Sequence, residues 1–105
     1  MNFGGSRFRA VVRRQLDLFA EDEAALLEEG NTADRAWTSA DRTESEELFG
    51  DYQLVVDAIG ERLYDIRESY AETLGEAAVD EYREAFNRVA LKRFKRYSSF
   101  LEEGE

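Results

Sequence analysis

An apolar repeat in the middle of the chain constrains the fold more than any other feature of this sequence. Its members alternate in spacing between three and four positions: Phe49, Tyr52, Val56, Ile59, Leu63, Ile66 and Tyr70. This is the spacing of a helix with one continuous apolar seam, as in coiled coils. The sequence contains no proline and sustains no strand-type alternation. It therefore predicts an all-α protein.

The periodicity places three long helices in one domain that spans residues 1–105. The first is predicted over about residues 6–29, the second over about residues 44–74 and the third over about residues 76–102. The second helix has an alternative start near residue 33, so residues 32–43 are either a loop or helical. The short connections make consecutive helices antiparallel neighbours in an up-down-up, coiled-coil-like bundle.

Local signals define the predicted helix ends. Ser6 can cap the first helix, and Gly30 followed by Asn31 can end it, because glycine and asparagine adopt the left-handed conformation that stops helices. Thr43 and Glu46 match a capping box at the start of the second helix. Each signal rests on residue type and spacing alone.

The net charge of −10 is distributed unevenly along the chain. Residues 1–16 carry four arginines and no acid, residues 17–87 carry 21 acids against five arginines, and residues 88–101 carry five basic residues and no acid. In an antiparallel bundle, both basic ends would lie beside the acidic second helix. We therefore expect two sets of neighbours. One set is Arg7, Arg9, Arg13 and Arg14 near Asp65, Glu68 and Glu72, and the other is Lys92 to Arg96 near Glu44, Glu46 and Glu47.

Apolar residues outside the main seam indicate association between chains. Leu48, Val55 and Tyr64 flank the seam of the second helix, and Phe94, Tyr97 and Phe100 spread around the third. A helix with a wide apolar surface must bury it on more than one side. We therefore expect a homodimer formed through helix faces, and an unidentified protein partner is a further candidate.

The missing residue types exclude several kinds of chemistry. Without cysteine and histidine, the chain can form no disulfide, Cys- or His-ligated metal site or Ser-His-Asp triad. No nucleotide-binding or catalytic motif is present, so we expect neither an enzyme nor a metal or other cofactor. The N-terminal residues lack the apolar run of a signal peptide or membrane span, which predicts a cytoplasmic protein without membrane contact.

Two regions are candidates for an interaction site. The first interleaves four cations with two aromatic rings: Lys92, Arg93, Phe94, Lys95, Arg96 and Tyr97. Such a pattern can bind phosphates and stack bases, but it is also typical of a helix C-terminus with core aromatics. We favour the second interpretation and do not expect nucleic acid as a partner. The second region is Trp37, which could anchor a partner, although packing over the end of the helical core is the favoured interpretation.

A ladder of carboxylates on the second helix is the one pattern that could hold a hard cation. It comprises Asp57, Glu61, Asp65, Glu68 and Glu72. Because the apolar seam faces inward, we expect the ladder on the solvent-exposed side of the helix, where it binds no metal.

Twelve of the fourteen basic residues are arginine, acids are in excess and cysteine is absent. In this composition the chain resembles small, acidic, functionally uncharacterised helical proteins of haloarchaea. The resemblance implies a compact helical protein that can dimerise and suggests no catalytic residues. The function expected from the sequence is a non-catalytic structural or protein-interaction module. A nucleic-acid-associated or nucleic-acid-mimicking protein is the alternative.

Overall fold

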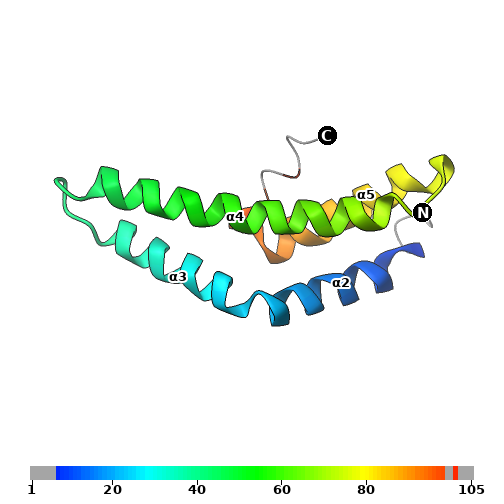
Figure 1. Ribbon diagram of the computed structural model, residues 1–105, viewed down its shortest axis with the longest axis horizontal. Coiled ribbons are helices and arrows are strands. Elements are labelled where there is room, and N and C mark those ends of the chain that lie inside the picture. Colours follow the sequence, from blue (N-terminus) through cyan, green and yellow to red (C-terminus); the bar gives the residue numbers. More distant parts are fainter. Residues whose placement is uncertain (1–6, 99–100, 102–105) are drawn as a thin grey trace.

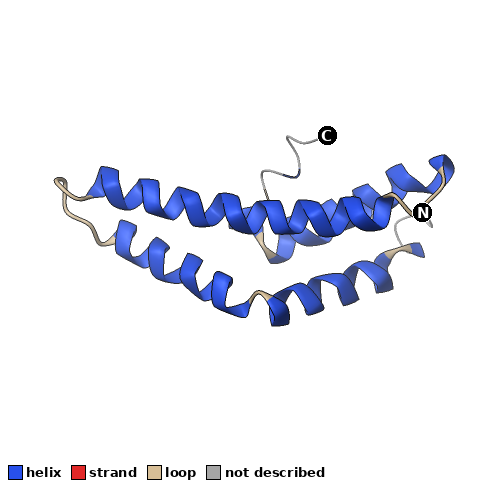
Figure 2. Ribbon diagram, in the orientation of Figure 1, coloured by secondary structure: helices blue, strands red, loops and turns tan. Residues whose placement is uncertain are grey.

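The computed structural model describes residues 7–98 and Leu101. The elements are α2 (Arg9–Asp22), α3 (Ala24–Thr38), α4 (Ser45–Ala71), α5 (Glu76–Arg93) and the short 3₁₀ helix η1 (Lys95–Tyr97) (Figure 1). Four α-helices and no strand occur in the described residues (Figure 2). The all-α prediction is confirmed, whereas the prediction of three helices is wrong.

The first predicted helix is divided at Glu23. There the backbone leaves the helical conformation, with φ −108° and ψ 27°, and α2 and α3 meet at an angle (Figure 1). Hydrogen bonds of helical spacing continue on both sides, from the Glu23 amide to the Phe19 carbonyl (2.8 Å) and from the Leu27 amide to the Glu23 carbonyl (2.9 Å). The division is therefore a bend within a nearly continuous helical arm. The predicted cap, Ser6, lies outside the described residues.

Gly30 and Asn31 do not end a helix, because α3 continues through them to Thr38. None of the described residues has a positive φ. Gly30 is buried, and a Cβ atom there would lie 2.7 Å from the Tyr97 hydroxyl oxygen and 3.2 Å from Ile59 Cδ1. The glycine therefore permits a close approach between elements. Residues 32–38 are helical, so the loop between α3 and α4 is shorter than the 32–43 alternative.

The second predicted helix corresponds to α4, which begins at Ser45, close to the predicted residue 44. The predicted capping box does not form, since no side chain caps this helix. Instead Asp41 Oδ1 accepts hydrogen bonds from the Thr43 hydroxyl (2.7 Å) and the Glu44 amide (3.0 Å). These bonds lower the pKa of Asp41. A preceding aspartate therefore organises the turn, as in an Asx turn.

The third predicted helix ends early, at Arg93 instead of residue 102. Phe94 adopts φ −129° and ψ 50°, and the chain continues into η1. The buried Ser98 hydroxyl donates a hydrogen bond to the Phe94 carbonyl (2.7 Å) and so fixes this turn. As a result, α5 stops near the middle of α4 and never reaches its N-terminal end (Figure 1).

Helix packing follows from the bend and from the early end of α5. Helix α2 packs mainly on α5, whereas α3 packs along α4 and η1 fills the space beside α4. The largest buried apolar side chains are Phe8, Val12, Leu16, Phe19, Ile59, Leu63, Tyr82, Phe86, Tyr97 and Leu101. Burial of the α4 seam falls towards its N-terminal end, where Phe49 is 43% exposed. Beyond η1, therefore, α3 and α4 continue as a two-helix hairpin.

Candidate functional site

The basic turn, residues 92–97, comprises the end of α5 and η1. Its two aromatic rings point into the protein. Phe94 packs edge to face against Phe19 of α2, with ring centroids 5.2 Å apart, and Tyr97 is buried against Gly30 of α3. The two rings therefore contribute to the core. Phe100, the third aromatic residue expected nearby, lies outside the described residues.

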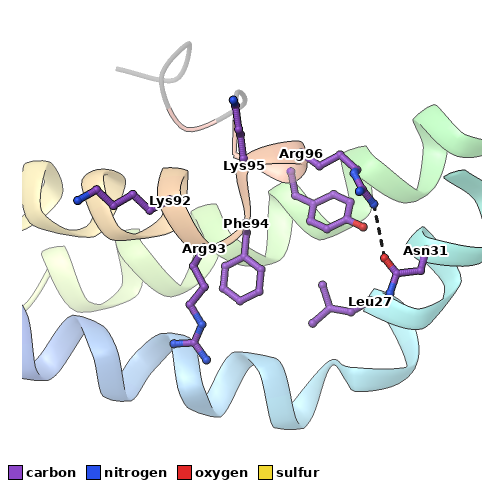
Figure 3. A pocket seen from close by; sticks show the side chains of 8 residues that line it. Leu27, Asn31, Lys92, Arg93, Phe94, Lys95 and Arg96 are labelled. Atoms are coloured by element: carbon purple, nitrogen blue, oxygen red, sulfur yellow. Dashed lines mark hydrogen bonds between the residues drawn. The ribbon is translucent and has the colours of Figure 1, made fainter.

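The cations of the basic turn diverge. Arg93 forms an ion pair with Asp17 of α2, with Nη1 and Oδ1 2.7 Å apart. Arg96 forms one with Asp34 of α3, with Nη1 and Oδ2 3.7 Å apart. Figure 3 shows Lys92, Arg93, Lys95 and Arg96 pointing in different directions from the turn. The prediction that this segment lies near Glu44, Glu46 and Glu47 is wrong, because α5 ends before it reaches them.

An open hollow of about 710 Å³ lies beside the basic turn, lined by Leu27 and Asn31 of α3 together with residues 92–97 (Figure 3). Across this hollow, Arg96 Nη1 donates a long hydrogen bond of 3.5 Å to Asn31 Oδ1. Since the cations do not converge there and both arginines already have carboxylate partners, the hollow has no cluster of charges that could hold one phosphate group.

Trp37 belongs to an aromatic cluster that joins α3 to α4. Its ring stacks on Tyr52 with centroids 5.6 Å apart and an interplanar angle of 11°, and it lies 5.0 Å from the ring of Phe49. Burial and the nearby Asp34 carboxylate raise the pKa of Tyr52. Because Asp34 also pairs with Arg96, the two candidate regions of the sequence adjoin in the structure. Trp37 is half-buried and packs across the hairpin.

The carboxylate ladder of α4 is exposed at four of its five positions, as predicted. The exception is Glu68, which is half-buried and accepts hydrogen bonds from Nη2 and Nε of Arg83, at 2.6 and 3.0 Å. These bonds, followed by those from Arg67, lower the pKa of Glu68. Within the described part of the chain, no group of three or more acidic side chains could hold a metal ion.

The polar network around Glu68 was missed by the sequence reasoning. Arg67 is only 2% exposed, and its guanidinium donates hydrogen bonds to Glu68 Oε2 (2.7 Å) and Asn87 Oδ1 (2.8 Å). It also lies over the Tyr64 ring, 5.1 Å from the centroid. The available signal was position: Arg67 follows Leu63 of the apolar seam by four residues, which places both on one face of α4.

A groove of about 450 Å³ runs between α3 and α4. Its lining residues are Ala25, Glu28, Glu29, Thr32, Ala33, Ala36, Leu48, Asp51 and Val55. Leu48 and Val55, two of the three residues predicted to flank the seam, are only half-buried there. We call this hollow the α3–α4 groove.

A second groove, of about 340 Å³, lies between α2 and α4 and is lined in part by Leu18, Arg62 and Ile66. Leu48, Val55 and Arg62 succeed one another at intervals of seven residues, so the two grooves follow one side of α4. Leu27 and Asn31 of α3 line the hollow beside the basic turn, whereas a different set of α3 residues lines the α3–α4 groove. The groove and the basic turn therefore lie on different faces of α3. The side of the molecule that carries both grooves, away from η1, is called the open face below.

The N-terminal arginines do not pair with α4 as predicted. Arg7 pairs with Glu81 of α5 (2.8 Å), since α2 packs on α5. Arg9, Arg13 and Arg14 are exposed and line a shallow hollow on the outer side of α2, together with Asp17 and Leu18.

Comparison with known proteins assigns the chain to no family. No protein-family model matches it, and no curated protein and no solved structure matches it either. The resemblance to acidic helical proteins of haloarchaea therefore stays a prediction. Over residues 7–98 and 101, the structure contains no helix that combines the length and the apolar character required to cross a membrane.

Proposed function

We propose that this protein is a non-catalytic helical interaction module that forms a homodimer through its open face. The α3–α4 groove is the observation that carries the proposal. The short helix η1 packs on the other side of the α3–α4 pair, while no helix of the described residues lies over the groove. A helix laid in the groove would add a third helix to this hairpin and bury a second side of α4.

The chemistry of the groove suits a helical occupant. Alanines on the α3 side allow a close approach, and Leu48 and Val55 on the α4 side offer apolar surface that is still half-exposed. Completing the burial of each of these two side chains would contribute about 1 kcal/mol. Leu18, 44% exposed at the adjoining groove, extends the apolar surface towards α2.

The alternative function, association with nucleic acid, has less support. It would use the basic turn, where Arg93 and Arg96 are engaged by Asp17 and Asp34. Binding to a phosphate backbone requires cations that can follow it together. The cations of this turn point apart (Figure 3).

Light scattering coupled to gel filtration tests the proposed dimer. We expect the wild-type chain to elute with twice its monomer mass of 12.1 kDa. Leu48→Glu and Ala36→Glu place a bulky charged side chain where the partner helix would pack closely and should weaken the dimer at least tenfold. Ala36 is exposed in the monomer, so its variant reports on association without disturbing the core.

Leu54→Glu provides the matched control. Leu54 is 70% exposed, lies on α4 between the groove residues Asp51 and Val55, and lines neither groove. Its variant should dimerise as the wild type does, with unchanged helicity by circular dichroism. The proposal is wrong if the wild type is monomeric at every concentration, or if Leu54→Glu disrupts the dimer as strongly as the groove variants do.

A further inference from the structure

Three arginines in the first two turns of α2 have no ion-pair partner among the residues that the structure describes. Arg9, Arg13 and Arg14 are exposed, and none forms an ion pair with any described residue. Cations at a helix N-terminus are disfavoured by the macrodipole, and no acidic residue occupies the first turn of α2 to offset this. No carboxylate of the described residues therefore pairs with these arginines, which points to an anionic group on a partner.

The rim of the α3–α4 groove is acidic. Glu28, Glu29 and Asp51 line it and are all exposed. Glu28 forms a long, exposed ion pair with Arg35, at 3.5 Å. Over residues 24–57 the chain carries nine acids and two arginines, a net charge of −7. The groove should therefore bind a basic helix more tightly than an acidic or neutral one.

The arginine surface belongs to α2 and the acidic groove to the α3–α4 hairpin. These helices lie towards opposite ends of the molecule, whose longest dimension is 52 Å (Figure 1). Leu18 connects them, because it lines both the hollow beside Arg13 and Arg14 and the groove between α2 and α4. The arginine surface is thus continuous with the open face. A two-fold axis near the bend at Glu23 would lay α2 of each copy along the groove of the other, and each contact would occur twice.

We infer that the occupant of the α3–α4 groove is α2 of a second copy, placed antiparallel so that Arg14 and Leu18 face Glu29 and the groove. This inference rests on the proposed dimer and specifies its orientation and charge pairing. The molecule measures 52 by 26 Å along its two longest axes, which leaves room for the roughly 800 Å² that each partner buries in a typical specific interface.

Disulfide trapping tests the orientation. Because the native sequence contains no cysteine, every disulfide must involve an introduced residue. Two single-cysteine variants, Arg14→Cys and Glu29→Cys, are oxidised separately and as a mixture. In the antiparallel dimer, residue 14 of one copy lies beside residue 29 of the other copy, and the two residues 14 lie far apart. The mixture should therefore form a mixed disulfide dimer, while each variant alone stays largely uncrosslinked. Efficient crosslinking of either variant with itself would overturn the inference.

Charge reversal tests the pairing. Arg14→Glu and Glu29→Arg should each weaken the dimer at least tenfold, and the double variant should recover most of the affinity because both contacts are then restored with exchanged charges. Lys95→Glu and Glu61→Arg are the controls. Both positions are exposed, line no part of the open face and should leave the dissociation constant unchanged.

The outcomes separate this inference from the proposed function. If Leu48→Glu disrupts the dimer while Arg14→Glu does not, the groove is the interface and the arginine pairing is wrong. If the wild type is monomeric, both are wrong. Binding to a labelled DNA duplex is the last measurement. If the wild-type monomer binds the duplex and Arg14→Glu abolishes this binding, the arginines contact nucleic acid and the inference is wrong.

Discussion

Tyr97 of η1 lies directly against Gly30 of α3, so closely that a Cβ atom on residue 30 would be 2.7 Å from the Tyr97 hydroxyl oxygen. The contact places η1 against both α3 and α4, because Ile59 of α4 also lies close to Gly30. It also explains why a glycine is found inside a helix. The tertiary contact offsets the lower helix propensity of glycine, which is about 1 kcal/mol relative to alanine.

Two of the helical glycines, Gly30 and Gly50, should respond oppositely to alanine. Gly30→Ala forces Tyr97 or Ile59 to move in a packed interior and should lower the free energy of unfolding by about 1–3 kcal/mol. Gly50→Ala has no atom within 4 Å of the new Cβ and lies exposed in α4, so it should raise that free energy by about 1 kcal/mol. Urea unfolding followed by circular dichroism measures both.

A second change checks the cause at Gly30. Tyr97→Phe removes the oxygen atom nearest to the new Cβ, so the Gly30→Ala variant should be less destabilised in the Tyr97→Phe background than in the wild type. Equal losses in the two backgrounds would show that the Tyr97 contact is not responsible.

Glu68 should make part of the stability depend on acid pH. Hydrogen bonds from Arg83 and Arg67 hold its pKa below the ordinary value of 4.5. The ionised carboxylate therefore stabilises the folded protein above that value, and the contribution is lost as pH falls through the lowered pKa. Glu68→Gln should cost about 2 kcal/mol near neutral pH, where it leaves the buried Arg67 with a weaker acceptor, and much less near pH 3.

Glu72→Gln is the matched control for Glu68, since Glu72 is an exposed member of the same ladder. Its effect on the free energy of unfolding should stay within about 0.5 kcal/mol at both pH values. A Glu68→Gln effect that does not change with pH would contradict the role assigned to this carboxylate.

Tyr82 should ionise later than an ordinary tyrosine. Burial raises its pKa to about 12 from the usual 10, and its hydroxyl donates a hydrogen bond to Gln15 Oε1 at 2.8 Å. In a spectrophotometric titration, Tyr82→Phe should remove a step near pH 12. Because the folded pKa is raised, the phenol's contribution to stability is complete below pH 10 and declines as pH rises towards 12. The variant should also be about 1 kcal/mol less stable.

The acidic surface should make stability depend on salt. With a net charge of −10, the folded chain repels itself, and molar KCl shortens the screening length to about 3 Å. Helicity and melting temperature should therefore rise from dilute buffer to molar KCl. Equal melting temperatures across that range would contradict this expectation.

Periodicity predicted the elements of this fold much better than their ends. The seam from Phe49 to Tyr70 lies on α4, whose start was predicted to within one residue. Helix ends depend on contacts that local sequence does not encode. Asp41, rather than Thr43 with Glu46, organises the turn before α4, and α5 ends at Arg93 although residues after it remain apolar at helical spacing.

The candidate sites show the same division. The sequence identified the basic turn and Trp37 as chemically distinctive, and it identified Leu48 and Val55 as apolar surface that needs a cover. It could not pair the charges, because pairing depends on which helices touch. Once α2 packs on α5, Arg7 meets Glu81, and Arg9, Arg13 and Arg14 are left on the outside.

The sequence by itself determined an all-helical, acidic chain without histidine or cysteine chemistry, since residue composition and the 3.6-residue period are local properties. Only the tertiary structure decided that the first arm bends at Glu23, that Gly30 receives Tyr97 and that Arg67 is buried. These features arise from contacts between residues 20 to 67 positions apart or from the path of a whole helix. One consequence of that packing is an acidic groove between α3 and α4 and, on the outer side of α2, three arginines that form no ion pair with a described residue.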